Sequence, residues 1–359
     1  MTASTDTTVA VDDSSATDDG GAGDPILQVR NLKKYFPAGR SVLGIGRDKQ
    51  WVRAVDDVSF QIAEGETLGL VGESGCGKST IAKLLLRLED PTEGSIRFAG
   101  EEISTLKGKE LLAYRRRVQA VFQDPYASLS PRMRVRDIIG EGLEIHTDMS
   151  SSEVTERVHD VLDLVGMRPE VGRLYPHEFS GGQRQRIAIA KALAVDTKML
   201  VLDEAVSALD VSIRAQVITL LKDLQQELGI AYLYIGHDLA TVSYLADRVM
   251  VMYLGKLVEM DDSVALVGEP KHPYTEALFA AALPSHPDDV HDTSGQATAE
   301  VPSAVAPPPG CHFHPRCPEA MDQCSVDYPP MVTLSSGRDV ACHLHPPSSV
   351  TTELEDAAT

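Results

Sequence analysis

Several features that would place a protein in or beyond a membrane are absent from this sequence. No stretch approaches the roughly 18 continuous apolar residues that a membrane-spanning helix needs. The N-terminus also lacks the basic and then apolar layout of a signal peptide. We therefore expect a cytosolic protein whose contact with any membrane runs through a partner.

Basic residues are scarce as well. The 359 residues include 33 Lys and Arg against 53 Asp and Glu, a net charge of −20, and nothing offers a basic face for nucleic acid. Thirteen of the acidic residues lie in three segments without a basic residue, at 1–24, 285–309 and 347–359, which leaves −7 for the rest. These polar segments cannot bury enough apolar surface to order themselves. We predict a disordered acidic tail, a flexible linker and a second disordered tail.

The most specific local pattern lies at residues 67–86. The apolar run 67–71 predicts a buried strand and residues 81–86 predict a helix. The sequence between them matches G-x-x-x-x-G-K-[ST], a loop whose N–H groups form an anion nest beside a helix N-terminus. Lys78 is suited to reach the terminal phosphates, and the Ser79 hydroxyl to help hold Mg²⁺. We predict a nucleoside triphosphate site that is formed by Gly72, Glu73, Ser74, Gly75, Cys76, Gly77, Lys78, Ser79 and Thr80.

Two carboxylates follow another apolar run, at residues 199–202. Asp203 and Glu204 therefore lie at the C-terminal end of a predicted buried strand, where ligands bind in an open parallel sheet. Asp203 is suited to hold Mg²⁺ opposite Ser79, and Glu204 to polarise an attacking water. Strands alternate with helices along the chain, which predicts an α/β core with a largely parallel sheet. Residues 124–195 are helix-rich and predict an inserted helical subdomain.

Further elements occur in one order and carry a family resemblance. Residues 179–186, Phe-Ser-Gly-Gly-Gln-Arg-Gln-Arg, resemble the LSGGQ motif of ATP-binding-cassette (ABC) ATPases. Gln123 stands where that family has its Q-loop, residues 207–210 resemble its D-loop, and His237 resembles its switch histidine. The resemblance covers about residues 25–260. It implies an ABC-type P-loop NTPase core, RecA-like, with a mostly parallel sheet plus antiparallel strands.

The resemblance also implies roles for single residues. Tyr35 would stack on adenine, and Gln123 would contact both nucleotide and Mg²⁺. The catalytic residues would be Glu204, His237, Gln123 and Lys78. The chain has Ala205 and Gly236 where the family commonly has Pro and Ser, and neither change removes a catalytic group. We expect an active ATPase that uses ATP and Mg²⁺.

A second anion site is predicted where Ser180, Gly181, Gly182 and Gln183 begin a helix that continues to residue 194. Free N–H groups and the helix dipole favour a phosphate there. Two such helix ends in one chain cannot both easily reach a single ATP. The resemblance implies that these four residues cover the ATP of a partner subunit, so that ATP joins two cassettes head to tail.

We place the ATPase cassette at residues 25–262. The sequence after it indicates which branch of the ABC family the chain resembles. A predicted helical extension at 263–284 contains His-Pro-Tyr-Thr, and a four-cysteine module follows at 310–346. Both resemble the ATP-binding subunits of oligopeptide and dipeptide permeases. The run 123–129 and the insertion that follows Tyr35 look closest to the F-type subunit of that family.

This resemblance implies an ATPase that energises import of di- or oligopeptides through a membrane transporter. Its partners would be a second, D-type ATPase subunit, two membrane permeases and, indirectly, an external peptide-binding protein. The chain would then be a peripheral protein on the cytoplasmic side of the membrane. Alternatives stay open: a soluble ABC ATPase acting on a ribosome or DNA, an ATPase for related substrates such as nickel complexes, and a regulatory cassette that does not hydrolyse ATP.

The cysteine module itself allows three interpretations. Disulfides are disfavoured in a reducing cytosol, whereas four thiolates can hold a [4Fe–4S] cluster or zinc. The spacing C-x₅-C-x₆-C-x₁₇-C lacks the C-x₂-C pairs of a zinc ribbon. We favour an iron–sulfur cluster with a structural or redox-sensing role, and zinc or no metal are the alternatives. The candidate ligands are Cys311, Cys317, Cys324 and Cys342.

Overall fold

The computed structural model describes residues 25–38, 50–124, 128–282 and 302–347. The predicted tail at 1–24, residues 285–301 of the predicted linker and residues 348–359 lie outside these ranges. Across the described residues, no helix is both long enough and apolar enough to cross a membrane.

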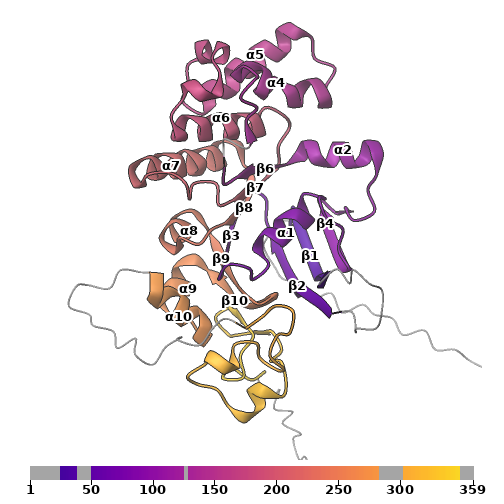
Figure 1. The fold of residues 1–359 in the computed structure, drawn as a ribbon, viewed down its shortest axis with the longest axis vertical. Coiled ribbons are helices and arrows are strands. Elements are labelled where there is room, and N and C mark those ends of the chain that lie inside the picture. Colours follow the sequence, from indigo (N-terminus) through magenta and orange to yellow (C-terminus); the bar gives the residue numbers. More distant parts are fainter. Residues whose placement is uncertain (1–24, 39–49, 125–127, 283–301, 348–359) are drawn as a thin grey trace, which may run out of the picture.

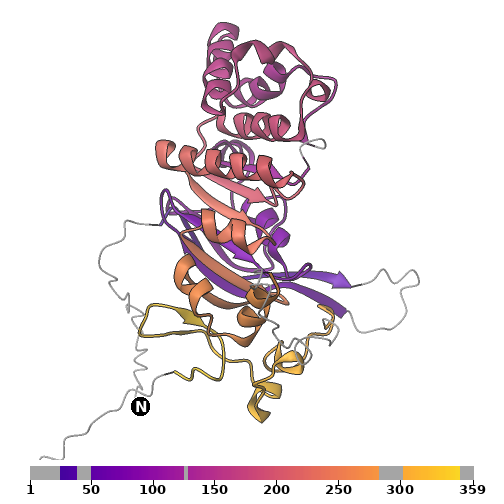
Figure 2. The same cartoon turned by 90° about the vertical axis from the view of Figure 1, so that its left-hand side faces the viewer.

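A long hairpin opens the fold. β1 (Leu27–Ala38) pairs antiparallel with β2 (Gln50–Ile62) on one side and with β4 (Glu93–Phe98) on the other. The short strand β5 (Glu101–Glu102) pairs antiparallel with β4 at the edge of this sheet. Alternate residues of β2 near its end are buried and exposed, as period-two patterning requires of a strand with one covered face. Figure 2 shows the far end of the hairpin projecting from the body.

A second, eight-stranded sheet forms the centre of the molecule (Figure 1), in the order β11-β12-β10-β9-β3-β8-β7-β6. The strands from β9 to β6 pair in parallel, and β10 adds antiparallel to β9. The inner strands are buried on both faces, so they are continuous apolar runs. The α/β class and the mixed sheet predicted from the sequence are confirmed. The strand bounds are β3 Thr67–Val71, β6 Val118–Phe122, β7 Met199–Asp203, β8 Ala231–Ile235, β9 Arg248–Tyr253 and β10 Lys256–Asp262.

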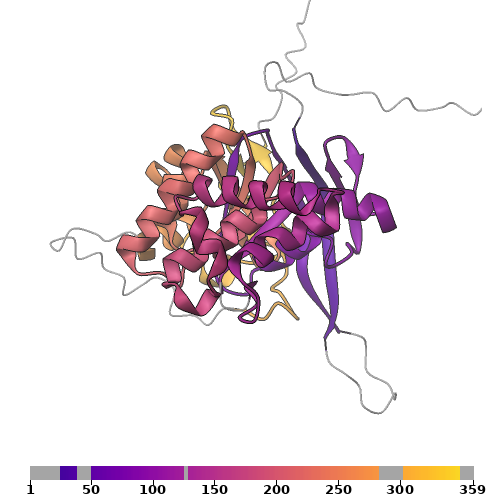
Figure 3. The same ribbon diagram turned by 90° about the horizontal axis from the view of Figure 1, so that it is seen from above.

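Helices cover this sheet and form a separate block at one end. The block contains α4, α5 and α6 and lies within the predicted subdomain at 124–195; it lies uppermost in Figure 1 and over the sheet in Figure 3. Ser150 and Ser180 begin α5 and α6 with capping boxes, which satisfy the first N–H groups of each helix. The helix bounds are α1 Lys78–Leu85, α2 Gly108–Arg117, α4 Val135–His146, α5 Ser151–Leu164, α6 Gly181–Leu193, α7 Val211–Leu228, α8 Leu239–Leu245, α9 Ser263–Gly268 and α10 Pro273–Ala282.

The C-terminal module is joined to the central sheet. Its short strands β11 (Val332–Thr333) and β12 (Asp339–Val340) extend the sheet, because β12 pairs with β10. Short 3₁₀ turns occupy His314–Arg316 and Asp322–Ser325. Phe313 of the module and Tyr274 of α10 belong to the same buried cluster as the strands and α6. The module and α10 therefore pack as part of the ATPase body.

Candidate functional site

The phosphate loop leaves β3 and enters α1 as the sequence predicts. It borders a cavity of about 320 Å³ that also receives Glu204, His237 and two residues of β2, Val52 and Ala54. Seven of the nine predicted loop residues line this cavity; Glu73 and Cys76 do not. Burial raises the pKa of the Cys76 thiol, so this residue fills the loop's interior as a neutral group. The lining loop residues are Gly72, Ser74, Gly75, Gly77, Lys78, Ser79 and Thr80.

Two glycines of the loop are required by close backbone approaches. Gly72 has φ 148° and Gly77 has φ 116°, conformations that side chains disfavour. A Cβ at Gly72 would lie 2.1 Å from the carbonyl oxygen of Met252, and one at Gly77 would lie 2.1 Å from that of Ala54. The loop is thus pressed against β9 and β2. Lys78 is buried at its end, and its Nζ donates hydrogen bonds to the carbonyl oxygens of Gly72 (2.7 Å) and Glu73 (3.0 Å).

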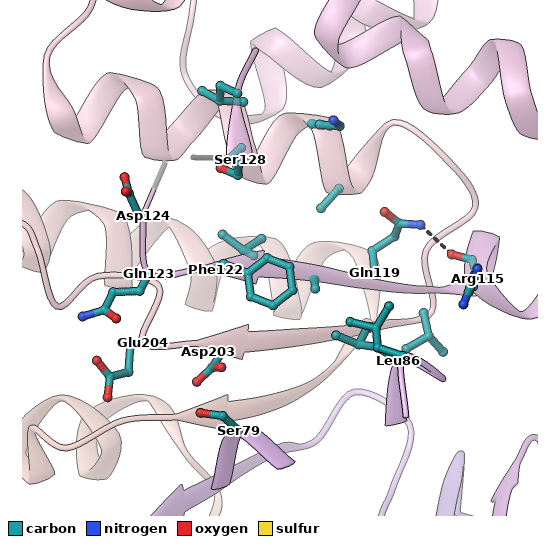
Figure 4. A pocket seen from close by; sticks show the side chains of 18 of the residues that line it. Ser79, Leu86, Arg115, Gln119, Phe122, Gln123, Asp124, Ser128, Asp203 and Glu204 are labelled. Atoms are coloured by element: carbon teal, nitrogen blue, oxygen red, sulfur yellow. Dashed lines mark hydrogen bonds between the residues drawn. The ribbon is translucent and has the colours of Figure 1, made fainter. Parts of the chain in front are cut away.

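Ser79 and Asp203 meet where α1 approaches the end of β7 (Figure 4). The Ser79 hydroxyl donates a hydrogen bond to the Asp203 carboxylate. Burial raises the pKa of Asp203, and the charge of Glu204 adds to this, whereas Ser79 and Lys78 lower it. A hydroxyl and a carboxylate are hard oxygen ligands of the kind that Mg²⁺ takes, so this pair fits the predicted metal.

Glu204 follows β7 in a left-handed conformation, with φ 51°. Non-glycine residues seldom adopt this region, and strained backbone of this kind concentrates at functional sites. Its carboxylate oxygen lies 3.5 Å from Nδ1 of His237, which follows β8. The predicted catalytic pair is therefore together at the rim of the phosphate cavity.

Gln123 follows β6 and borders a larger cavity of about 860 Å³. Figure 4 shows its side chain beside Glu204, and Ser79 and Asp203 also line this cavity. The cavity then runs under the helical subdomain, past Phe122 to Lys191 of α6. It connects the proposed metal ligands to the subdomain surface.

The residues that resemble the LSGGQ motif, 180–183, lie apart from this cavity. Ser180 caps α6: its hydroxyl oxygen accepts from the N–H of Gln183, and the Gln183 amide oxygen accepts from the N–H of Ser180. A Cβ at Gly182 would lie 2.3 Å from the Ile213 side chain of α7, so glycine is required there. Of the described residues lining the phosphate cavity, none belongs to the set Ser180, Gly181, Gly182 and Gln183.

The strand register bears on which aromatic residue of β1 stacks on adenine. Tyr35 pairs with Arg53, and its hydroxyl donates to Asp56, on the face of the hairpin turned away from the phosphate loop. Phe36 pairs with Val52, whose side chain lines the phosphate cavity. Neighbouring residues of a strand point to opposite faces, so Phe36 and not Tyr35 lies on the nucleotide side.

The four predicted cysteine ligands are free thiols within one module. Burial raises the pKa values of Cys311, Cys317 and Cys342, the last to about 11, and the neighbouring thiols add to each shift. In the described parts of the chain, no group of three or more His, Cys, Asp or Glu side chains is arranged to hold a metal ion.

A phosphate loop that opens a helix, with carboxylates at the end of a neighbouring parallel strand and an inserted helical subdomain, defines the class of P-loop ATPase cassettes. Residues 55–207 match the family described as "ABC transporter". Residues 258–324 match the "Oligopeptide/dipeptide transporter, C-terminal region". The chain belongs to the ATP-binding proteins of ABC transporters, and the resemblance seen in the sequence is confirmed.

Relatives extend over nearly the whole chain. It is 49% identical over 324 residues to the "Putative oligopeptide transport ATP-binding protein YkfD" of Bacillus subtilis, covering 89% of this chain and 96% of that protein. It is 45% identical over 318 residues to the dipeptide transport ATP-binding protein DppF of Haemophilus influenzae, with coverage of 89% and 96%. Among solved structures, the ATP-binding cassette MJ0796, a dimer bound to ADP and phosphate, matches with TM-score 0.57 and 27% identity over 66% of this chain and 98% of that one.

Proposed function

We propose that this chain is the ATP-hydrolysing subunit that energises import of di- or oligopeptides through a membrane ABC transporter. One observation carries the proposal. The same chain combines the predicted phosphate-binding and catalytic residues around one cavity with, at residues 258–324, the C-terminal region of oligopeptide and dipeptide transporters. Relatives named for oligopeptide and dipeptide transport align over 89% of the chain and support the same substrate class.

Each residue of the site has a role that its position supports. The loop N–H groups and Lys78 bind the phosphates, and Ser79 with Asp203 would hold Mg²⁺, which neutralises phosphate charge when bound. Glu204 polarises the attacking water. His237, whose Nδ1 lies 3.5 Å from the Glu204 carboxylate, holds that carboxylate in place and contacts the terminal phosphate. Gln123 bridges this chemistry and the cavity beneath the helical subdomain. Phe36 takes the adenine-stacking role first given to Tyr35.

The chain works as one half of a dimer of cassettes. The capped N-terminus of α6 offers N–H groups and a dipole outside the chain's own phosphate cavity. Ser180 to Gln183 therefore suit the ATP of a partner, which we infer to be a D-type homologue. The cassette matched above is itself a dimer with ADP and phosphate.

Two membrane permeases and an external peptide-binding protein complete the assembly. We infer that the permeases dock at the cavity beside Gln123, so that closure of the dimer moves them. The same docking holds the chain at the cytoplasmic side of the membrane. Affinity purification from solubilised membranes tests this: membrane permeases should co-purify with the chain, and peptide should stimulate phosphate release by the complex. Recovery with ribosomes or DNA would support the soluble rival, and stimulation by nickel complexes alone would replace the substrate class.

The proposal also includes a metal cofactor, an iron–sulfur cluster or zinc, at the cysteine module. The proposal rests on four cysteines in one module, three of which raise the pKa of Cys342; the described side chains would have to move together to bind a [4Fe–4S] cluster or zinc. Anaerobic purification decides between them. Iron and sulfide with absorbance near 400 nm identify a cluster, zinc by elemental analysis identifies the alternative, and neither leaves the thiols free.

A further inference from the structure

One residue of the phosphate loop is held from outside the nucleotide-binding core. Glu73 directly follows Gly72, yet its side chain does not line the phosphate cavity. It points to the C-terminal module instead, where Arg316 binds it across 243 positions of sequence. The loop that carries nucleotide and the module that carries the cysteines are therefore in direct contact.

The contact has the geometry of a strong ion pair. Arg316 donates two parallel hydrogen bonds to the Glu73 carboxylate, from Nη1 to Oε2 at 3.0 Å and from Nη2 to Oε1 at 2.9 Å. The Arg316 side chain is 7% exposed and that of Glu73 is 27% exposed. A guanidinium fork on a carboxylate fixes orientation as well as distance, and little water screens this one. The Tyr253 hydroxyl, 3.3 Å from Nη1, accepts a further bond from Arg316.

The same loop residue is also held through its backbone. The Glu73 N–H donates to the hydroxyl of Tyr274 at 2.9 Å, and Tyr274 is buried in α10. This N–H is therefore turned toward α10 and away from the phosphate nest. Tyr274 packs on Tyr253 and Phe313, with ring centroids 4.6 and 5.4 Å away, so its hydroxyl has little freedom to move.

A third connection reaches the middle of the loop. The turn between β9 and β10 accepts a bond from His312, whose Nδ1 lies 3.2 Å from the Leu254 carbonyl oxygen. The next residue, Gly255, donates its N–H to the Cys76 carbonyl oxygen at 2.9 Å. The module thus braces the loop at Glu73 and, through this turn, at Cys76.

We propose that Arg316 and Tyr274 are positioning residues of the ATP site, through which the C-terminal module holds the phosphate loop in its nucleotide-binding conformation. A glycine-rich loop has many accessible conformations, and ordering it in advance lowers the cost of binding. The inference rests on the proposed function, because it concerns how that site binds nucleotide. It adds a role for the C-terminal module within the ATP-binding subunit itself.

Titration of MgADP into the purified full-length chain by calorimetry tests the proposal without a partner subunit. Arg316→Gln and Glu73→Gln should each raise the Kd for MgADP by about 3–10-fold, and the double variant should be no weaker than either alone, since both remove one ion pair. Tyr274→Phe removes only the hydroxyl and should raise the Kd in the same direction. Arg316→Lys, which keeps the charge and loses the fork, should fall between wild type and Arg316→Gln.

Turnover separates positioning from chemistry. The loop grips the phosphates equally in the ground and transition states, so KM for ATP should rise while kcat stays within about twofold. Arg248→Gln is the matched control. It breaks a comparable pair with Glu66, at 3.0 Å, at the opposite end of β3 from the loop. It should lower the melting temperature and leave the Kd for MgADP unchanged.

An unchanged Kd in folded Arg316→Gln and Glu73→Gln would overturn the proposal, as would additive effects of the two or an equal loss in Arg248→Gln. Glu73→Gln leaves the C-terminal module intact and keeps the test open if Arg316→Gln does not fold. Failure of the wild-type chain to bind MgADP at all would instead overturn the proposed function.

Discussion

Replacement of Glu204 by Gln tests the chemistry of the site most sharply. The backbone of Glu204 is held independently of its carboxylate: its N–H donates to the Ile235 carbonyl oxygen at 2.9 Å, and its own carbonyl oxygen accepts from the Ser207 hydroxyl at 3.0 Å. An amide of the same size can therefore take the same place. It keeps the shape of the site and loses the ability to polarise water.

The expected loss follows from that change alone. A positioned general base contributes about 10²–10⁴-fold, which is about 3–5 kcal/mol of transition-state stabilisation. We expect kcat for Glu204→Gln to fall by that factor, while the Kd for MgATP stays within about threefold because the phosphate loop is untouched. The neighbouring Asp203 also loses a repelling charge, so its pKa should fall toward the ordinary value.

Phosphate release at saturating MgATP measures the first effect, and equilibrium titration with MgATP measures the second. His237→Asn serves as a companion, since it removes the group 3.5 Å from Glu204 and leaves the carboxylate in place. Undiminished phosphate release by Glu204→Gln would refute the role given to this residue. A parallel loss of MgATP binding would show that the variant damages the pocket and that the carboxylate is not specifically a base.

Three further predictions concern the groups around it. Lys78→Ala should weaken MgADP binding by at least about tenfold, measured by calorimetry, since it removes the buried ammonium at the phosphate loop; unchanged affinity would contradict that role. Burial and Glu204 raise the pKa of Asp203, so the folded state disfavours its charged form and the stability it contributes is lost as pH rises through that pKa. Asp203→Asn should then raise the melting temperature of the nucleotide-free chain at pH 7.5 and abolish Mg²⁺ dependence of ATP binding, and wild-type Mg²⁺ affinity should weaken as pH falls toward the raised pKa; a lower melting temperature would contradict the sign. Phe36→Ala should weaken ATP binding by about 5–150-fold, because stacking on a base is worth about 1–3 kcal/mol, and Tyr35→Ala should weaken it less; the reverse order would return the stacking role to Tyr35.

The sequence predicted the parts of the site that depend on local pattern. A strand, a glycine loop and a helix in consecutive positions are visible at residues 67–86, and β7 ends where Asp203 and Glu204 were expected. The sequence also predicted that the phosphate loop and these two carboxylates lie close together, because parallel strands bring their carboxyl ends to one edge of a sheet.

Features set by register or by long-range contact were not accessible. The face on which Phe36 lies depends on the pairing of β1 with β2 beyond the bulges in that ladder, and no composition rule gives that register. The joining of β12 to β10 rests on two-residue pairing, which leaves no period to detect. The contact of Arg316 with Glu73 spans 243 positions and comes from tertiary packing alone.

The central claim is that ATP hydrolysis at this site powers peptide import. Uptake of a mixture of di- to pentapeptides by intact cells, followed by mass spectrometry, tests it directly when the native gene is replaced by the wild-type or the Glu204→Gln form. The account predicts uptake with the wild-type chain and its loss with Glu204→Gln at equal protein levels in the membrane. Equal uptake by both forms would contradict it.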